Sequence, residues 1–204
     1  MALEPPSLFA RWRWVALAGL FYLFLAALGT GLLLLWGLEE EALRLARGER
    51  PLPLQFALGA AVGLAMVALS FLSLRLFPLA RELELKLALL IGPVGWGRAL
   101  VLALLSGVAE EFFFRIVLLP KLGRFWSSLI FALMHTGRGR AFLLWTATAA
   151  VLGALFAVLV LAGWGLASVA TAHFLINAIN LTRMGRISRR IREARRIPEG
   201  EEEA

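Results

Sequence analysis

Long runs of apolar residues alternate with short polar segments along the 204-residue chain. A helix crosses the hydrocarbon core of a bilayer with about 20 mostly apolar residues, and several of these runs are long enough to do so. A soluble domain of this size would bury a single core and would not need so many unbroken apolar windows. The pattern therefore predicts an all-α, polytopic transmembrane helix bundle. We expect about six spans, at residues 14–36, 54–77, 98–119, 125–136, 141–162 and 164–182.

The first and fourth spans differ from the others in length. The first apolar stretch, Val15 to Trp36, exceeds the about 7 to 15 residues of a signal-peptide core, and no small-residue cleavage site follows it. We interpret it as a retained span. The apolar part of the fourth, Trp126 to Met134, is too short to cross the hydrocarbon alone. We expect this segment to be tilted, buried by its neighbours, or extended through its flanks.

Three polar segments separate or follow the spans. Residues 39–51, EEEALRLARGERP, have helix-forming character and are expected as a surface helix or loop. Residues 79–97 alternate Leu with Glu or Lys and then break at glycines and a proline, which indicates an interfacial amphipathic segment, although the alternation at 81–87 fits a strand equally well. The tail at 183–204 is basic and then acidic, and we expect a short membrane-surface helix followed by a disordered end.

Charge and composition limit the kinds of binding partner and chemistry expected for the chain. The formal charge of +7 is spread over short loops and the tail beside apolar segments, which fits lipid headgroups better than nucleic acid. Counted on the six-span topology, fifteen Lys and Arg residues fall on one side and five on the other. We therefore expect an integral protein of a bacterial plasma membrane with both termini cytoplasmic. Cysteine is absent, which excludes disulfides, thiolate metal sites and a cysteine nucleophile.

Six polar residues lie inside predicted spans. An ionisable side chain at the bilayer centre costs roughly 2.5 to 3.5 kcal/mol on insertion scales, so it is expected to be paired or functional. The six include both histidines of the chain. They are Glu110, Glu111, Arg115, His135, His173 and Asn177.

Helical spacing sorts these residues. Glu111 and Arg115 are four apart, so they share a helix face and can form a structural ion pair. Glu110 lies about 100° around the helix from Glu111 and has no local partner, so it is expected to face another helix. His173 and Asn177 are also four apart and project together from the last span. We expect the partners of Glu110 to lie across the bundle, at His135, His173 and Asn177.

Three short motifs follow one another in this region. EEFFFR fits EExxxR, Phe131 to His135 fits FxxxH, and His173 to Asn177 fits HxxxN. Together they resemble the CPBP family, also called ABI or type II CAAX prenyl endopeptidases, which are intramembrane proteases with an eight-helix core. The resemblance covers residues 98–182. Two departures are that the family's glycine after the motif arginine is Ile116 here, and that the chain appears two spans shorter.

The resemblance implies roles for the motif residues. Glu110 would activate a water, His135 would hold or polarise it, and His173 with Asn177 would stabilise the oxyanion, while the Glu111 and Arg115 pair would be structural. A buried imidazole and amide can stabilise a developing oxyanion by a few kcal/mol. On this basis we divide the chain into N-terminal spans with the interfacial segment, a CPBP-like catalytic core and a cytoplasmic tail, at residues 1–97, 98–182 and 183–204.

Alternatives remain open from the sequence. The favoured reading requires no cofactor, but a zinc-dependent variant would use Glu110, His135 and His173 as ligands with water in the open position. A non-catalytic membrane scaffold or bacteriocin self-immunity protein is a second alternative, and a transporter with Glu110 in a proton relay is a third. The expected partners are a peptide or membrane-protein substrate and membrane lipids, and no nucleic acid.

Overall fold

The chain folds as an all-α membrane helix bundle. The computed structural model describes residues 8–194, and this part of the chain contains helices and no strand. The elements in chain order are α1 (Leu8–Trp36), α2 (Glu39–Arg47), α3 (Leu52–Leu76), α4 (Pro78–Ile91), α5 (Trp96–Glu111), η1 (Phe112–Leu118), α6 (Leu119–Met134), α7 (Arg140–Leu159), η2 (Val160–Trp164) and α8 (Gly165–Ala194). The labels η1 and η2 mark π-helical segments.

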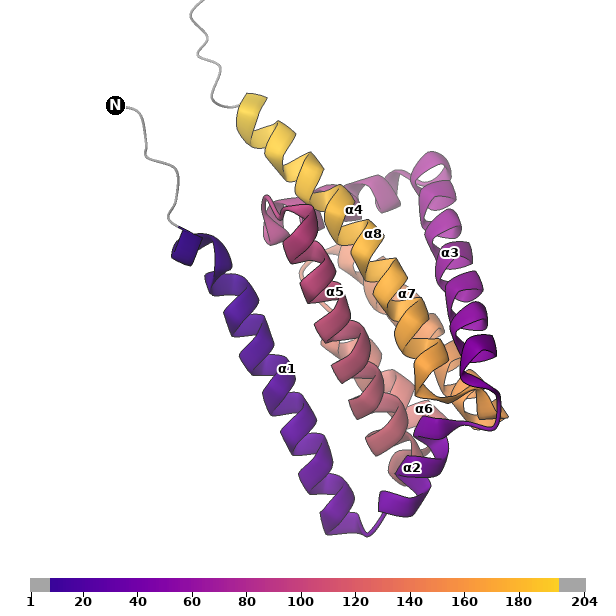
Figure 1. Ribbon diagram of the computed structural model, residues 1–204. Coiled ribbons are helices and arrows are strands. Elements are labelled where there is room, and N and C mark those ends of the chain that lie inside the picture. The colour runs from indigo at the N-terminus through magenta and orange to yellow at the C-terminus, as the bar shows by residue number, and fades with distance from the viewer. Residues whose placement is uncertain (1–7, 195–204) are drawn as a thin grey trace, which may run out of the picture.

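Helix α8 runs through the middle of the bundle (Figure 1). It packs against α3 on one side and α5 on the other, while α6 packs against α7. Helix α1 stands at the edge beside α5, and α2 lies at the end of the bundle to which α1 descends. Helix α4 crosses the opposite end and contacts α7 and α8.

The predicted spans all fall on helices. By length and apolar composition, the described residues contain three stretches able to cross a membrane, Val15–Trp36, Leu52–Leu76 and Arg140–Ala194. A fourth results if Pro78–Ile91 and Trp96–Met134, which meet at 102°, are taken together. The stretch Arg140–Ala194 carries two of the predicted spans, because the chain turns between α7 and α8 at Gly163 (φ 80°) and Gly165 (φ 67°). These are left-handed conformations that glycine adopts without strain.

The short fourth span corresponds to α6. The backbone departs from helical geometry inside this helix at Gly123 (φ 75°), so only the part after that glycine runs straight. Its inner face is buried by neighbouring elements: Ser127, Ser128, Phe131 and Ala132 are all inaccessible to solvent or nearly so. Burial by neighbours is therefore the alternative that the structure supports for this span.

The polar segments resolve into helices. Residues 39–47 form α2, and residues 78–91 form α4, so the strand alternative for 81–87 is wrong. Pro78 occupies the first turn of α4, where proline's missing N–H is tolerated, and Gly92 (φ 75°) ends the helix.

The beginning of the tail corrects a prediction. Residues 183–194 are helical, as expected, but they continue α8 without a break and do not form a separate surface helix. No proline interrupts this stretch, and Met184, Gly185 and Ser188 are buried, with Gly185 lying against the backbone of Val94. The predicted disordered end falls within residues 195–204, outside the described residues.

Small residues bring α8 close to its neighbours. A Cβ added at Gly59 of α3 would meet the backbone oxygen of Ser168, and one added at Gly63 would lie 3.0 Å from the oxygen of Ala172. On the other side, a Cβ at Gly107 of α5 would lie 3.0 Å from the backbone nitrogen of Phe174. Close backbone approach through small residues is a usual way for helices to associate in membranes. It holds α8, the helix of His173 and Asn177, between α3 and α5.

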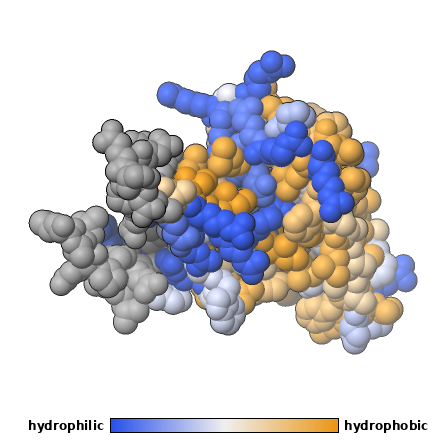
Figure 2. Space-filling view, turned by 90° about the horizontal axis from the view of Figure 1, so that it is seen from above, coloured by the Kyte–Doolittle hydropathy of each residue, from blue (hydrophilic) through white to orange (hydrophobic). Residues whose placement is uncertain are grey.

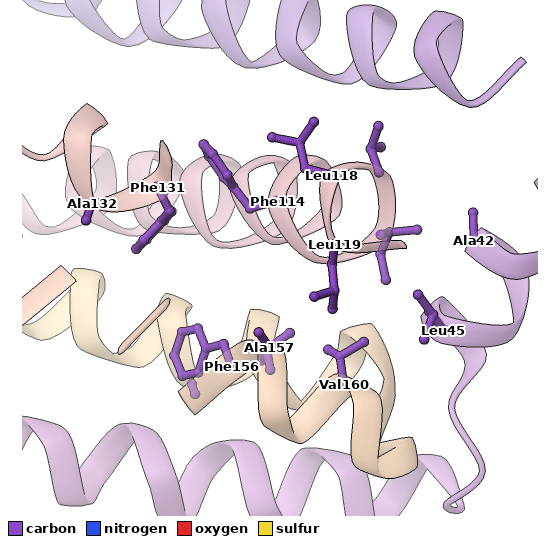
Figure 3. Close-up of a cluster of buried hydrophobic side chains, with 14 of the residues drawn as sticks. Ala42, Leu45, Phe114, Leu118, Leu119, Phe131, Ala132, Phe156, Ala157 and Val160 are labelled. Atoms are coloured by element: carbon purple, nitrogen blue, oxygen red, sulfur yellow. The ribbon is translucent and has the colours of Figure 1, made fainter. Parts of the chain in front are cut away.

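A large hydrophobic cluster extends from α2, at one end of the bundle, along η1, α6 and α7 (Figure 3). It contains Phe114, Phe131 and Phe156 together with Leu45 of α2 and Val160 of η2. The opposite end, seen from above in Figure 2, carries hydrophilic side chains, whereas the sides of the bundle expose hydrophobic ones. Exposed apolar sides with polar ends are what a bilayer requires of a membrane-spanning bundle.

Candidate active site

Glu110 lies in the last turn of α5 and uses its two oxygens differently. The hydroxyl of Tyr22, on α1, donates a hydrogen bond of 3.0 Å to Oε1. Oε2 lies 3.8 Å from Nε2 of His135, on α6, and is buried without a hydrogen-bond partner in the described part of the chain. A separation of 3.8 Å is a close contact and not a hydrogen bond. One oxygen of Glu110 is thus held, and the other faces a histidine.

His135 is fixed by the end of its own helix. Its Nδ1 lies 2.8 Å from the carbonyl oxygen of Phe131, one turn earlier. Since a carbonyl oxygen can only accept, Nδ1 carries the proton, and in the neutral ring Nε2 has a free lone pair. The hydroxyl of Thr146 donates to the carbonyl of His135 at 2.8 Å, and the ring of Trp145 stands edge-on at 5.3 Å. These contacts from α7 keep Nε2 directed towards Glu110.

Glu111 joins two partners. Its Oε2 lies 3.1 Å from Nε of Arg115, so the expected ion pair is present, with both side chains fully buried. Its Oε1 lies 2.7 Å from Nδ1 of His173 on α8. Because a carboxylate can only accept, Nδ1 of His173 donates to it. Glu111, a member of the expected ion pair, is therefore also the partner of a candidate catalytic histidine.

Arg115 lies in the π-helical segment η1, where the helix widens directly after the two glutamates. Its Nη1 donates to the hydroxyl of Ser127 at 3.3 Å, and that hydroxyl donates to the carbonyl of Phe114 at 2.6 Å. Its guanidinium also lies 4.8 Å from the ring centroid of Phe131, a cation–π distance. Single π-helical turns inside longer helices are frequent at functional sites.

Asn177 lies one turn beyond His173 on α8. Its side-chain amide donates to the hydroxyl of Ser106 on α5 at 2.9 Å. An amide nitrogen carries two hydrogens, so a second donor remains. The hydroxyl of Ser106 in turn donates to the carbonyl of Ala103 at 3.2 Å. Asn177 is thus tied to α5 through Ser106.

Four ionisable groups in this cluster balance in charge. When both carboxylates are ionised and His173 is an imidazolium, in which Nδ1 still donates to Glu111, the two negative charges are matched by those of His173 and Arg115. Burying a charge without a partner is costly in a membrane, and pairing lowers that cost. Mutual neutralisation explains how helix α5 and its continuation carry three charges through an apolar bundle.

A cavity of about 980 Å³ adjoins the cluster. Glu110, His135, His173 and Asn177 all line it, together with Tyr22. Glu111 and Arg115 do not line it, since they lie behind this wall at zero exposure. The six polar residues selected from the sequence therefore separate into four that a ligand in the cavity could reach and two that it could not.

Two aspects of the site were missed or misassigned from the sequence. His173 was expected opposite Glu110, but its hydrogen bond goes to Glu111. Tyr22 was not singled out at all, although it is the only tyrosine in the chain and lies within a predicted span. A buried hydroxyl at that depth needs a partner, which was the available signal. Ser106 carried no comparable signal, because serines are common in membrane helices.

The donor set does not fit a zinc centre. Within residues 8–194, no three His, Cys, Asp or Glu side chains form a group able to hold a metal ion. A catalytic zinc site needs three protein ligands converging at about 2 Å from one point.

Comparison with known proteins gives one match. Residues 92–179 match the family model described as type II CAAX prenyl endopeptidase Rce1-like. This range contains all six polar residues discussed above. No curated protein and no solved structure matches the chain.

Proposed function

We propose that the chain, whose residues 92–179 match the type II CAAX prenyl endopeptidase (CPBP) family of intramembrane proteases, hydrolyses peptide bonds with a water activated by Glu110. The single observation that carries this proposal is the pair Glu110 and His135 at the wall of the cavity, 3.8 Å apart through Oε2 and Nε2. Both atoms are hydrogen-bond acceptors when the carboxylate is ionised and the imidazole is neutral. One water can donate a hydrogen to each, which leaves its lone pair directed into the cavity.

The chemical step follows from that arrangement. Glu110 accepts a proton from the water as the oxygen attacks the carbonyl carbon of the scissile bond, and the carbonyl π electrons move onto its oxygen. When the tetrahedral intermediate collapses, the C–N bond breaks, and Glu110 returns the proton to the leaving amine. The products are a carboxylic acid and an amine, and the carboxylate of Glu110 is regenerated.

Asn177 and His173 support the proposed oxyanion site. The second amide hydrogen of Asn177 is available, because only one is given to Ser106. His173 donates from Nδ1 to Glu111, so its Nε2 can donate to an oxyanion only in the imidazolium form. In that form, the group of Arg115, Glu111 and His173 carries one net positive charge next to the forming anion. Preorganised donors of this kind are often the largest contribution to catalysis in acyl transfer.

The proposal includes a location. The chain is an integral membrane protein, and we propose that the end bearing α4 and the last turns of α8 faces the cytoplasm. The residues there include Arg75, Arg81, Lys86 and Arg98, and Figure 2 shows hydrophilic side chains gathered at this end. An excess of Lys and Arg is typical of cytoplasmic loops. The substrates would be peptides or membrane-protein segments that reach the cavity.

A labelling experiment tests the proposal. Purified protein in detergent is incubated with a peptide library in ¹⁸O-water, and products are read by mass spectrometry for label in the new carboxyl group. We expect labelled products from the native protein, and a loss of at least about a hundredfold in Glu110→Gln. Glu82→Gln, an exposed carboxylate on α4, serves as the control and should cleave normally.

Three outcomes would contradict the proposal. Equal cleavage by Glu110→Gln and the native protein would remove Glu110 as the base. Loss of native cleavage on adding a chelator would favour the metal-dependent variant. No cleavage of any peptide would favour a scaffold or immunity role.

A further inference from the structure

We propose that Tyr22 of α1 is a positioning residue for the base, holding Glu110 so that its free oxygen faces His135. This inference rests on the proposed function, because it assigns a part in the same reaction. Tyr22 would not touch the reacting atoms. It would act through the carboxylate, by fixing which oxygen is engaged and which is left to bind water.

Tyr22 places a hydroxyl in a stretch of α1 that is almost wholly apolar. The helix is strongly apolar through Val15–Trp36, and its neighbours along the chain include Phe21 and Phe24. A phenylalanine at position 22 would pack equally well against Phe21, whose ring stands edge-on at 5.2 Å. Only the hydroxyl distinguishes tyrosine, and a hydroxyl inside a bilayer costs free energy unless it is hydrogen-bonded. Glu110 supplies the acceptor at 3.0 Å.

The bond breaks the equivalence of the two carboxylate oxygens. A glutamate side chain ends in a torsion with a broad, roughly two-fold preference, so an unrestrained carboxylate rotates readily. Tyr22 holds Oε1 from α1, while Oε2 lies 3.8 Å from His135 on α6. The two oxygens of the carboxylate therefore face two different helices, α1 and α6. Restricting this rotation reduces the entropy lost when water, base and carbonyl align.

Other charged groups do not perform this task. Glu111 and Arg115, from the same segment of chain, are bound to each other. His173, from α8, is bound to Glu111, and His135, from α6, approaches the other oxygen. Within residues 8–194, Tyr22 is the hydrogen-bond donor to Glu110. Loss of the Tyr22 hydroxyl would therefore leave the Glu110 carboxylate without a hydrogen-bond donor to take its place.

The hydrogen bond from Tyr22 to Glu110 also ties α1 to the rest of the bundle beside the cavity. This helix contacts α5, η1 and α2, and Phe21, Tyr22 and Leu25 are its contribution to the cavity wall. In the described part of the chain, Tyr22 makes the side-chain hydrogen bond that ties α1 to another helix. A helix that borders the cavity thereby also orients the base.

The test is Tyr22→Phe, which removes one oxygen atom and keeps the ring. Thr30→Val is the matched control, because it removes a hydroxyl from the same helix that lies outside the cavity wall and bonds only within α1, to Ala26. We measure kcat and KM for a peptide cleaved by the native protein, and the unfolding temperature of each variant. For Tyr22→Phe we expect kcat to fall about ten- to a hundredfold, as for loss of a hydrogen bond to a charged group, with KM and the unfolding temperature close to native. Thr30→Val should leave all three near native.

Each other outcome counts against the inference. An unchanged kcat in Tyr22→Phe would show that the bond does not orient the base. A fall in kcat that comes with a clear fall in the unfolding temperature, or with a similar loss of kcat in Thr30→Val, would indicate a structural role only. If the native protein cleaves no peptide, the proposed function fails and this inference fails with it. Cleavage by the native protein with full kcat in Tyr22→Phe overturns the inference alone.

Discussion

Glu111 on α5 and His173 on α8 meet through Oε1 and Nδ1 at 2.7 Å, across the interface that Gly107 keeps narrow. This contact makes the second glutamate of the EExxxR motif more than the partner of Arg115. It sets the direction of the His173 ring and decides which ring nitrogen is left to face the cavity. A carboxylate that orients a histidine in this way is a recurring device in catalytic sites.

Replacing Glu111 should therefore damage both stability and activity. In Glu111→Gln, Arg115 loses its charge partner at zero exposure, and removing one member of a buried pair costs about 3 to 5 kcal/mol. His173 would also lose the charge that favours its imidazolium form. We expect a large fall in the unfolding free energy, measured by SDS-induced unfolding in mixed micelles. Glu110→Gln should keep native stability within about 1 kcal/mol, since Tyr22 can still donate to the amide oxygen. Equal losses in the two variants would contradict this distinction.

Asn177 offers a test of the oxyanion site that barely changes side-chain size. Asn177→Asp replaces a donor with an acceptor that carries negative charge, at the cavity wall near Glu110. We expect kcat to fall by about a hundredfold or more, the cost of removing one oxyanion donor, with KM less affected. Asn180→Asp is the matched control, because Asn180 lines the same cavity one turn further along α8. Similar losses in both would indicate a general effect of charge in the cavity.

The close contact between α3 and α8 predicts that one added methyl group on α3 lowers the stability of the protein. In Gly59→Ala the new Cβ would meet the backbone oxygen of Ser168, an atom that cannot move without shifting the helix. We expect a loss of about 1 to 3 kcal/mol in the free energy of unfolding, the usual cost of overpacking. Gly31→Ala, in the exposed part of α1 with no atom within 4 Å of the new Cβ, should be neutral or slightly stabilising. A neutral Gly59→Ala would mean that α3 can move away from α8 freely.

An ion pair between α4 and α8, at the α4 end of the cavity, is predicted to stabilise the packing of α4. Glu84 of α4 lies 2.5 Å from Arg183 of α8, whose guanidinium also stands 4.5 Å from the ring of Phe71. Arg183→Gln removes the charge and the stacking together, so we expect faster hydrogen exchange throughout α4. Lys86→Gln, which breaks an exposed pair within α4, should have little effect, because exposed pairs contribute about 0 to 1 kcal/mol. Unchanged exchange in Arg183→Gln would show that apolar contacts alone hold α4.

The sequence predicted those features that depend on local spacing. The apolar runs located the helices, and four-residue spacing predicted the Glu111 and Arg115 pair. It also indicated that Glu110 must find its partners on other helices, which proved to be Tyr22 and His135. The assignment to the CPBP family, made on three motifs, is confirmed by the match to residues 92–179.

Features that depend on how helices rotate against one another were beyond the sequence. His173 bonds Glu111 and not Glu110 because of the rotation of α8 on α5, which no local pattern records. The alternation at residues 81–87 fits a helix and a strand equally, and contacts with α7 and α8 select the helix. The continuation of α8 into the tail likewise depends on burial of Met184 and Ser188, which a basic composition conceals.

The balanced cluster of Glu110, Glu111, Arg115 and His173 has a consequence for energised membranes. The membrane potential acts on net charge, at about 2.3 kcal/mol per elementary charge for each 100 mV. In the proposed reaction, a proton passes from water to Glu110 and then to the leaving amine, all within one cavity. No net charge crosses the bilayer at any stage. A protein built in this way would cleave its substrates at the same rate in polarised and depolarised vesicles, whereas a transporter that relays protons through Glu110 would not.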